Sequence, residues 1–329
     1  MVGILNAMIS SLPLGIMWSL TTIGVFITFR VLEVSDLTVD GTLTLGAASS
    51  VVLIAGGMNP YLSILVAFFF GLLAGLCTAL LHTRLKIPPL LSGILTMTAL
   101  YSINLRVMGR ANVSINKMET IFTHFTNVTG IPRRVGLPYG IFLSNVDVLI
   151  VGSVLVIVFA IGLYWFFGTE IGYALRATGN NPQMIRAQGV NTDIAKLMGL
   201  MLSNGLVAIS GALLAQSQRF AEVSMGTGTI VIGLASVIIG EVLFSTRSFK
   251  HYLISIILGS VIYRMVISIV LELGMNPNDL KLLTAAIIAA ALALPLIKSG
   301  FQIFSHASSK NSKQDQSQGM KRRNDHAQS

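Results

Sequence analysis

The residues most able to do chemistry in this chain are a few charged side chains set inside long apolar stretches. Arg264 lies near the middle of the apolar run HYLISIILGSVIYRMVISIVLELG, and Glu241 lies in VIIGEVLF. A charge in hydrocarbon is costly, so it needs an opposite charge, a water-filled cavity or an interface. We expect Arg264 to pair with Glu241 or with one of the acidic residues Glu33, Asp36 and Asp40. A structural ion pair and a role on a solute path both fit.

A second polar feature opens one of the apolar stretches. The segment DLTVDGTLTLGA, Asp36–Ala47, is rich in hydroxyl side chains and glycine. Irregular backbone at membrane depth is tolerated where protein or water lines it, and such broken helix starts often face a translocation path. The alternative is an ordinary helix start capped by Asp40. The candidate path residues are Asp36, Thr38, Asp40, Thr42, Thr44, Glu241 and Arg264.

A third feature is the polar segment EIGYALRATGNNPQMIRAQGVNTDIAK between two apolar runs. Asn180 or Asn181 can cap a short helix, Pro182 fits its first turn, and Gly189 can end it in the left-handed conformation. A helix of about two turns with few apolar residues is not stable alone in water. It must therefore dock on the ends of its own helices or on a separate cytoplasmic subunit. The candidate docking residues are Asn181, Pro182, Gln183, Met184, Ile185, Arg186, Ala187, Gln188 and Gly189.

Sequence motifs for catalysis and nucleotide binding are missing from the chain. It has no GxxxxGK[ST] phosphate loop, no HExxH and no GxSxG. Its one cysteine, Cys77, lies in an apolar run, where we expect a buried small residue and no metal cluster. We therefore expect no enzyme activity and no cofactor in this chain, and any ATP must be used by another subunit.

The elements that carry these residues are long apolar blocks. The 329 residues are 53% hydrophobic and only 11% charged, against roughly 25% charged residues in soluble domains. The blocks do not alternate as barrel strands do, and they are long enough to cross roughly 30 Å of hydrocarbon as helices. We expect an all-α, polytopic membrane bundle of nine segments at about 4–30, 41–57, 60–83, 87–108, 146–167, 195–217, 228–244, 252–272 and 281–298.

The basic residues of the short loops set the orientation. They lie on one side, which should be the cytoplasm, and this places the N-terminus outside and the C-terminus inside. The long loop 109–145 is also basic, although this orientation places it on the extracytoplasmic side, where the rule predicts few basic residues. We expect a transmembrane domain over 1–298 with a cytoplasmic loop at about 168–195, followed by a basic, disordered tail, 299–329, that is solvated or touches anionic lipid. The net charge of +9 lies largely in this tail and the short loops, so nucleic acid is not an expected partner.

Three segments together resemble the permease subunits of bacterial ATP-binding-cassette (ABC) importers. They are DLTVDGTLTLGA, ALRATGNNPQMIRAQGVNT and GLASVIIGEVLF. The resemblance covers about residues 10–298 and lies in the branch that includes the branched-chain amino acid and ribose systems. It is closest to the subgroup associated with aromatic amino acid uptake. One departure is that ribose-type members usually carry an additional N-terminal span, which this chain lacks.

The resemblance implies a type II-like permease in the bacterial inner membrane. Two copies, here a homodimer, would form the channel, two cytoplasmic ATPases would bind ATP and Mg, and an extracytoplasmic binding protein or lipoprotein would deliver a small solute, such as an amino acid. The segment 181–189 would be the coupling helix seated on the ATPase. The alternatives are an ion-driven secondary transporter, which should show inverted repeats and midplane ion ligands, and a scaffold without transport activity.

Overall fold

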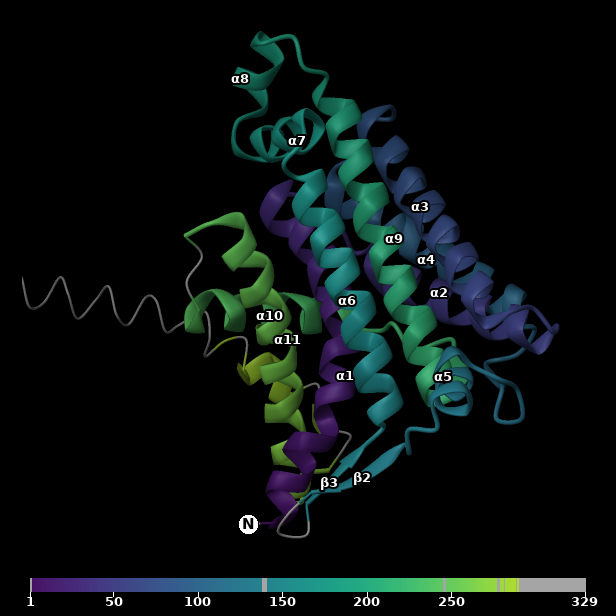
Figure 1. The fold of residues 1–329 in the computed structure, drawn as a ribbon. Coiled ribbons are helices and arrows are strands. Elements are labelled where there is room, and N and C mark those ends of the chain that lie inside the picture. Colours follow the sequence, from purple (N-terminus) through teal and green to yellow (C-terminus); the bar gives the residue numbers. More distant parts are fainter. Residues whose placement is uncertain are drawn as a thin grey trace, which may run out of the picture.

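The computed structural model is a bundle of long, nearly antiparallel helices with two short helices projecting from one end (Figure 1). It describes residues 2–137, 141–244, 247–276, 279–280, 282–287 and 289. In these ranges seven helices are long and apolar enough to span a membrane. They are α1 (Val2–Phe26, continued by the π-helical turn η1, Ile27–Val31), α2 (Thr38–Ala55), α3 (Pro60–Thr83), α4 (Pro89–Met108), α6 (Val146–Phe166), α9 (Thr192–Gln218) and α11 (Phe249–Glu272). A shorter apolar helix, α10, covers Thr229–Leu243.

The expected all-α membrane bundle is confirmed. Eight of the nine predicted segments coincide with these helices, and their ends differ by at most three residues when η1 is counted with α1. Most of the ninth predicted segment and the whole of the tail 299–329 lie outside the described residues. The span count therefore rests on eight helices, one of them short.

Helix α9 lies at the centre of the bundle, and small residues bring its neighbours close. A Cβ on Gly46 of α2 would overlap the carbonyl of Ala208, and one on Gly211 of α9 would overlap the carbonyl of Leu43. The GxxxG pair of α3 plays the same role, because a Cβ there would overlap backbone of α9. Close backbone approach through small residues is the usual way that membrane helices pack. These glycines therefore serve helix packing.

Two of the helices begin inside the bundle. Asp36 and Thr42, at the start of α2, bind Asn204, which lies near the midpoint of α9. The N-terminus of α10 bonds to Asp40 and so lies at the same depth. With 15 residues α10 is about 22 Å long, short of the roughly 30 Å of a full span. Helix α10 is thus a partial span, whereas α2, with 18 residues, is long enough to span. The irregular backbone expected for this polar segment is wrong, because Thr38–Ala47 is regular α-helix.

The loop 109–145 lies at the end of the bundle opposite to the projecting helices α7 (Glu170–Asn180) and α8 (Pro182–Ala187) (Figure 1). It contains β1 (Asn112–Ser114), α5 (Ile121–Thr129), β2 (Arg134–Leu137) and β3 (Ile141–Ser144). Strand β1 pairs with β4 (Phe220–Glu222), and β2 pairs with β3, both antiparallel. These two small sheets were not predicted. After β4 the segment 223–228 turns back into the bundle to reach α10.

Candidate functional site

The predicted docking helix is present as α8. Asn181 caps it, since its side chain accepts a hydrogen bond from the backbone N–H of Met184 at 3.0 Å. Pro182 occupies the first turn, and Gly189 follows with φ +85°, a left-handed conformation that favours glycine. The sequence therefore predicted both ends of this helix correctly. The helix before it, α7, was not predicted.

The side chains of α8 divide between two surfaces. Ile185 is 5% exposed and packs inward against its own chain, whereas Met184 is 49% exposed. The other exposed side chains are those of Gln183, Arg186, Ala187 and Gln188. The helix therefore uses one apolar residue to hold itself in place and presents the rest to the outside. The outward face is available to another protein.

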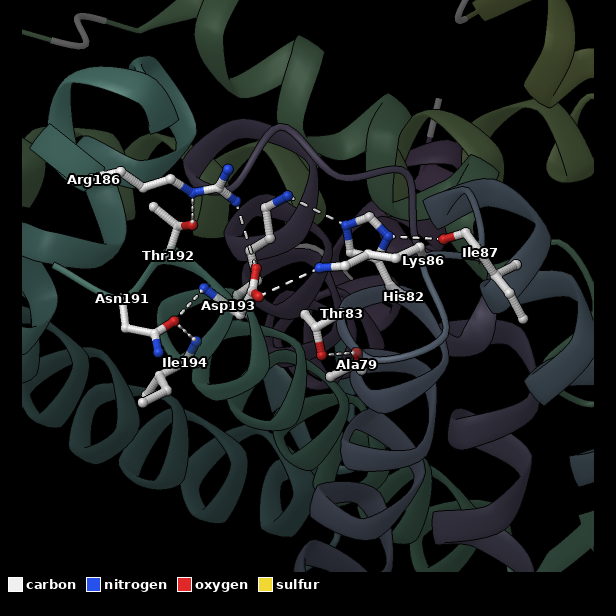
Figure 2. Close-up of polar contacts among 11 residues, drawn as sticks. Ala79, His82, Thr83, Lys86, Ile87, Arg186, Asn191, Thr192, Asp193 and Ile194 are labelled. Carbon is white, nitrogen blue, oxygen red and sulfur yellow. Dashed lines mark hydrogen bonds and ion pairs between the residues drawn. The ribbon is translucent and has the colours of Figure 1, made fainter.

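A polar network ties α8 to the starts of α9 and α4 (Figure 2). Arg186 Nε donates to Thr192 Oγ1 at 2.6 Å, and its guanidinium lies 3.6 Å from Asp193. Lys86 contacts the other oxygen of Asp193 at 3.6 Å. Asn191 caps α9 by accepting from the backbone N–H groups of Asp193 and Ile194. The two ion pairs are exposed and individually weak, so their main effect is to fix the position of the loop.

A lysine and a histidine continue this network. His82 Nδ1 lies 2.9 Å from the carbonyl oxygen of Ile87, and Lys196 Nζ lies 3.3 Å from His82 Nε2. An ammonium only donates, so Nε2 accepts and Nδ1 carries the proton. With Lys86, Arg186 and Lys196 around the single carboxylate of Asp193, the surface beside α8 carries a net positive charge.

Helix α7 connects α8 to the membrane helices. Leu175 is fully buried, and Gly179 lies so close to the carbonyl of Val31 that a Cβ would overlap it. Arg176 donates to the carbonyl of Phe167 at 2.8 Å and lies over the ring of Phe249. These contacts reach the ends of α1, α6 and α11 together. A displacement of α8 would therefore act on several spanning helices.

The first group of predicted path residues forms a buried polar centre at the start of α2. Asp36 Oδ1 accepts from the backbone N–H of Thr38 at 2.9 Å, and Oδ2 accepts from Asn204 Nδ2 at 2.7 Å. Thr42 donates to Asn204 Oδ1 at 2.7 Å, and Thr38 shares a hydrogen bond of 2.7 Å with Thr78. Each of these residues is at most 2% exposed. Asp36, Thr38 and Thr42 thus contact protein and do not line an open path in this structure.

Asp40 and Thr44 bind the segment that re-enters the bundle. The two oxygens of Asp40 accept from the backbone N–H groups of Gly228 and Ile230 at 2.8 and 2.9 Å. Thr44 accepts from Gly226 N at 3.0 Å. The alternative in which Asp40 caps its own helix is wrong, because this carboxylate caps α10. Asp36 supplies the corresponding acceptor at the start of α2.

The expected pair of Arg264 and Glu241 is also wrong. Glu241 binds Arg30, whose Nε donates to Oε1 at 2.7 Å, and it also accepts from the hydroxyl of Tyr252. Arg264 lies about three turns farther along α11, roughly 18 Å from Tyr252. Its guanidinium stacks over Trp18 at 4.3 Å from the ring centroid. Arg30 lies at the end of the first predicted segment and was counted among the basic residues of the short loops, so sequence reasoning did not identify it as the partner of Glu241.

Sequence reasoning also missed two amides of α9 that organise the interior. Asn204 joins Asp36 to Thr42, as described above. Gln216 donates to Ser50, to Ser63 and to the carbonyl of Pro60, and its Oε1 accepts from the backbone N–H of Ile121. Both stand out in the sequence as amides within an apolar run. An amide in an apolar run is expected to form hydrogen bonds inside the bundle, but the sequence does not show with which residues.

Comparisons with known proteins agree with this architecture. The family model described as branched-chain amino acid transport system / permease component matches residues 7–292. A tyrosine transport system permease protein of Clostridioides difficile is 40% identical over 89% of this chain and 91% of its own length. A probable branched-chain amino acid transport permease protein, LivH, of Methanocaldococcus jannaschii is 30% identical over 54% of each chain. No solved structure matches.

The family match covers nearly the whole bundle, including α2, α8 and α10. Several relatives are named as transport permeases, among them a nucleoside ABC transporter permease protein, NupC, of Lactococcus lactis, 28% identical over 61% of this chain and 65% of its own length. Together with the seven apolar spans, these matches place the chain in the inner membrane as a multi-pass protein. The chain belongs to the family of branched-chain amino acid transport permease components of ABC transporters.

Proposed function

We propose that this chain is the channel-forming subunit of an ABC importer for an amino acid with an aromatic side chain. The observation that carries the proposal is the outward face of α8, which is held by Asn181 and Ile185 and surrounded by net positive charge. A helix presented in this way on the predicted cytoplasmic end suits a docking surface for a cytoplasmic ATPase. Residues 181–189 are then the coupling helix.

The solute assignment is supported by the relative named for tyrosine transport, which aligns along nearly the full length. An extracytoplasmic binding protein or lipoprotein delivers the solute to the end that carries the loop 109–145. Two copies of the permease enclose the path between them, and the ATPases bind ATP and Mg. The permease catalyses no reaction itself.

The contacts of α7 supply a route for coupling. Closure of the ATPases displaces α8, and α7 transfers this displacement to the ends of α1, α6 and α11 through Gly179 and Arg176. A rigid-body change of this kind switches a bundle between two packed arrangements. Nucleotide hydrolysis in the partner is thereby connected to opening of the path.

The test of the docking surface is co-purification of the tagged permease with the candidate ATPase. Met184→Glu places a charge on the exposed face of α8, and we expect at least a tenfold loss of bound ATPase while the permease stays folded. Val128→Glu changes a 71% exposed valine of α5 at the opposite end and should retain the ATPase. Ile185 is unsuitable for this test because it is buried. Binding unaffected by Met184→Glu would contradict the proposal.

The solute is tested by ATP-dependent uptake of labelled tyrosine into cells that express the whole system. We expect unlabelled phenylalanine to compete for this uptake, and ribose to leave it unchanged. Uptake that persists without the ATPase, or that is inhibited by ribose and not by phenylalanine, would contradict the assignment. The coupling test above stays valid in either case, because it does not depend on the solute.

A further inference from the structure

A pocket lies beside the start of α2, between α2, α4 and the re-entering segment 223–228. It has a volume of about 330 Å³, which suits a small solute or part of one. Its side chains come from three parts of the sequence, and several polar groups lie among a mainly apolar surface. They include Asp40, Thr44, Thr98, Tyr101, Ser102 and Asn104.

One acceptor in this pocket has no donor in the described structure, and the carboxylate of Asp40, whose oxygens already accept from Gly228 and Ile230, has lone pairs left for a further donor. Asn104 is 1% exposed and donates through Nδ2 to the carbonyl of Gly41 at 3.0 Å, while its Oδ1 has no hydrogen-bond partner among the described residues. A buried amide oxygen without a donor costs free energy. Asp40 is the one charged residue that lines the pocket in the described structure. An unpaired amide oxygen near a carboxylate favours a cationic donor such as a primary ammonium group.

The surface of α4 argues that this pocket faces water. Thr98, Tyr101 and Ser102 are exposed on α4, Tyr101 by 55%. Other exposed residues of α4 are apolar, among them Leu95 (52%) and Ile103 (47%), and so is the exposed face of α6, where Val154, Ile157, Val158 and Ile161 are between 56 and 63% exposed. Lipid suits the surface of α6, whereas polar side chains are placed toward a cavity or an interface. The polar wall of α4 therefore belongs on the solute path.

We propose that this pocket is a contact site for the ammonium group of the translocated amino acid, with Asn104 and Asp40 as its acceptors. The identity of the solute rests on the proposed function, whereas the position and charge preference of the pocket do not. Thr98, Tyr101 and Ser102 form the wall that the solute passes. Asp36 and Thr42, deeper in the bundle, hold the start of α2 through Asn204 and thereby keep the pocket in place.

Cysteine labelling of the full complex in membranes tests the pocket. The native Cys77, expected to be buried, is exposed, so Cys77→Ala is the background. Ser102→Cys is treated with cationic 2-aminoethyl methanethiosulfonate and with its anionic 2-sulfonatoethyl counterpart. We expect the cation to react about tenfold faster because of the nearby carboxylate. Val154→Cys, on the exposed apolar face of α6, should not react, since a thiol in hydrocarbon does not ionise.

Ligand protection tests the ammonium contact. Tyrosine and tyramine, which both carry the ammonium group, should slow labelling of Ser102→Cys, whereas 3-(4-hydroxyphenyl)propionate, which lacks it, should not. Asn104→Leu should remove the protection. A cysteine at 102 that is unreactive, or that reacts equally with both reagents, overturns the site even if tyrosine uptake is normal. Failed tyrosine uptake with the tenfold charge preference intact overturns the solute and leaves the pocket standing.

Discussion

Exchanging Asp36 and Asn204 between their positions should preserve the buried polar centre that either single change disrupts. In Asp36→Asn an amide N–H₂ meets the N–H₂ of Asn204, and in Asn204→Asp two carboxylates face each other where the present contact is 2.7 Å. In the double variant the amide at 36 donates to the carboxylate at 204, which still accepts from Thr42. The N–H of Thr38 keeps its acceptor as well. One hydrogen bond is lost, the 3.0 Å contact of Asn204 Nδ2 with the carbonyl of Leu200.

These contacts set the expected magnitudes. A hydrogen bond to a charged group contributes about 1.5–3 kcal/mol, and a neutral one about 1 kcal/mol. We expect Asp36→Asn to cost about 2 kcal/mol and Asn204→Asp about 3 kcal/mol or more, because two buried like charges repel. The double variant should cost only about 1 kcal/mol.

The assay is the midpoint of heat-induced loss of the monodisperse peak of the purified permease in detergent. At about 2–4 °C per kcal/mol, the single variants should lose about 4–12 °C and the double variant at most about 4 °C. Thr98→Val, an exposed hydroxyl on α4, serves as a control and should change the midpoint little. A double variant no more stable than Asn204→Asp would refute the bonding pattern.

Three further predictions use the same assay. Gly46→Ala should lower the midpoint strongly, since its Cβ would overlap the backbone of α9. The control Gly162→Ala, which has no atom within 4 Å of the new Cβ, should be neutral or slightly stabilising. Equal effects of the two changes would contradict the packing. Arg264→Met should be tolerated, because the described structure gives this arginine an aromatic ring and no carboxylate; a severe loss would indicate an anionic partner. Glu241→Gln should destabilise the permease by about 1–2 kcal/mol, a small value because Arg30 is half exposed and solvent screens the ion pair. Adding Arg30→Gln should restore part of the lost stability. Additive losses in the double variant would contradict the ion pair.

The sequence predicted those features that depend on neighbouring residues. The apolar blocks gave eight helices, because the length of a span is fixed by the thickness of the bilayer. Asn181, Pro182 and Gly189 gave the ends of α8, because caps and left-handed turns are local. Each of these needed only the local order of residue types.

Contacts between segments far apart in the sequence could not be predicted from local patterns of residue types. Arg30 and Glu241 are separated by 211 positions, and a periodic pattern carries no information on which of several charges will meet. The depth of Arg264 along α11 excluded Glu241 only once the two helices had been placed. The same limit applied to Asp40, whose partner Gly228, the residue before α10, lies 188 positions later.

The two aspartates of the segment DLTVDG have related but separate tasks. Each helix that begins inside a membrane exposes backbone N–H groups that water cannot reach. Asp36 accepts from the first turn of α2, and Asp40 accepts from the first turn of α10. Asp36 precedes α2 and Asp40 lies in its first turn, so one short segment satisfies the starts of two helices. Loss of Asp40 therefore affects the position of α10 as well as the charge of the pocket. For this reason its neutral variant alone cannot identify a solute contact, whereas Asn104 and Ser102 can be changed without removing a helix cap.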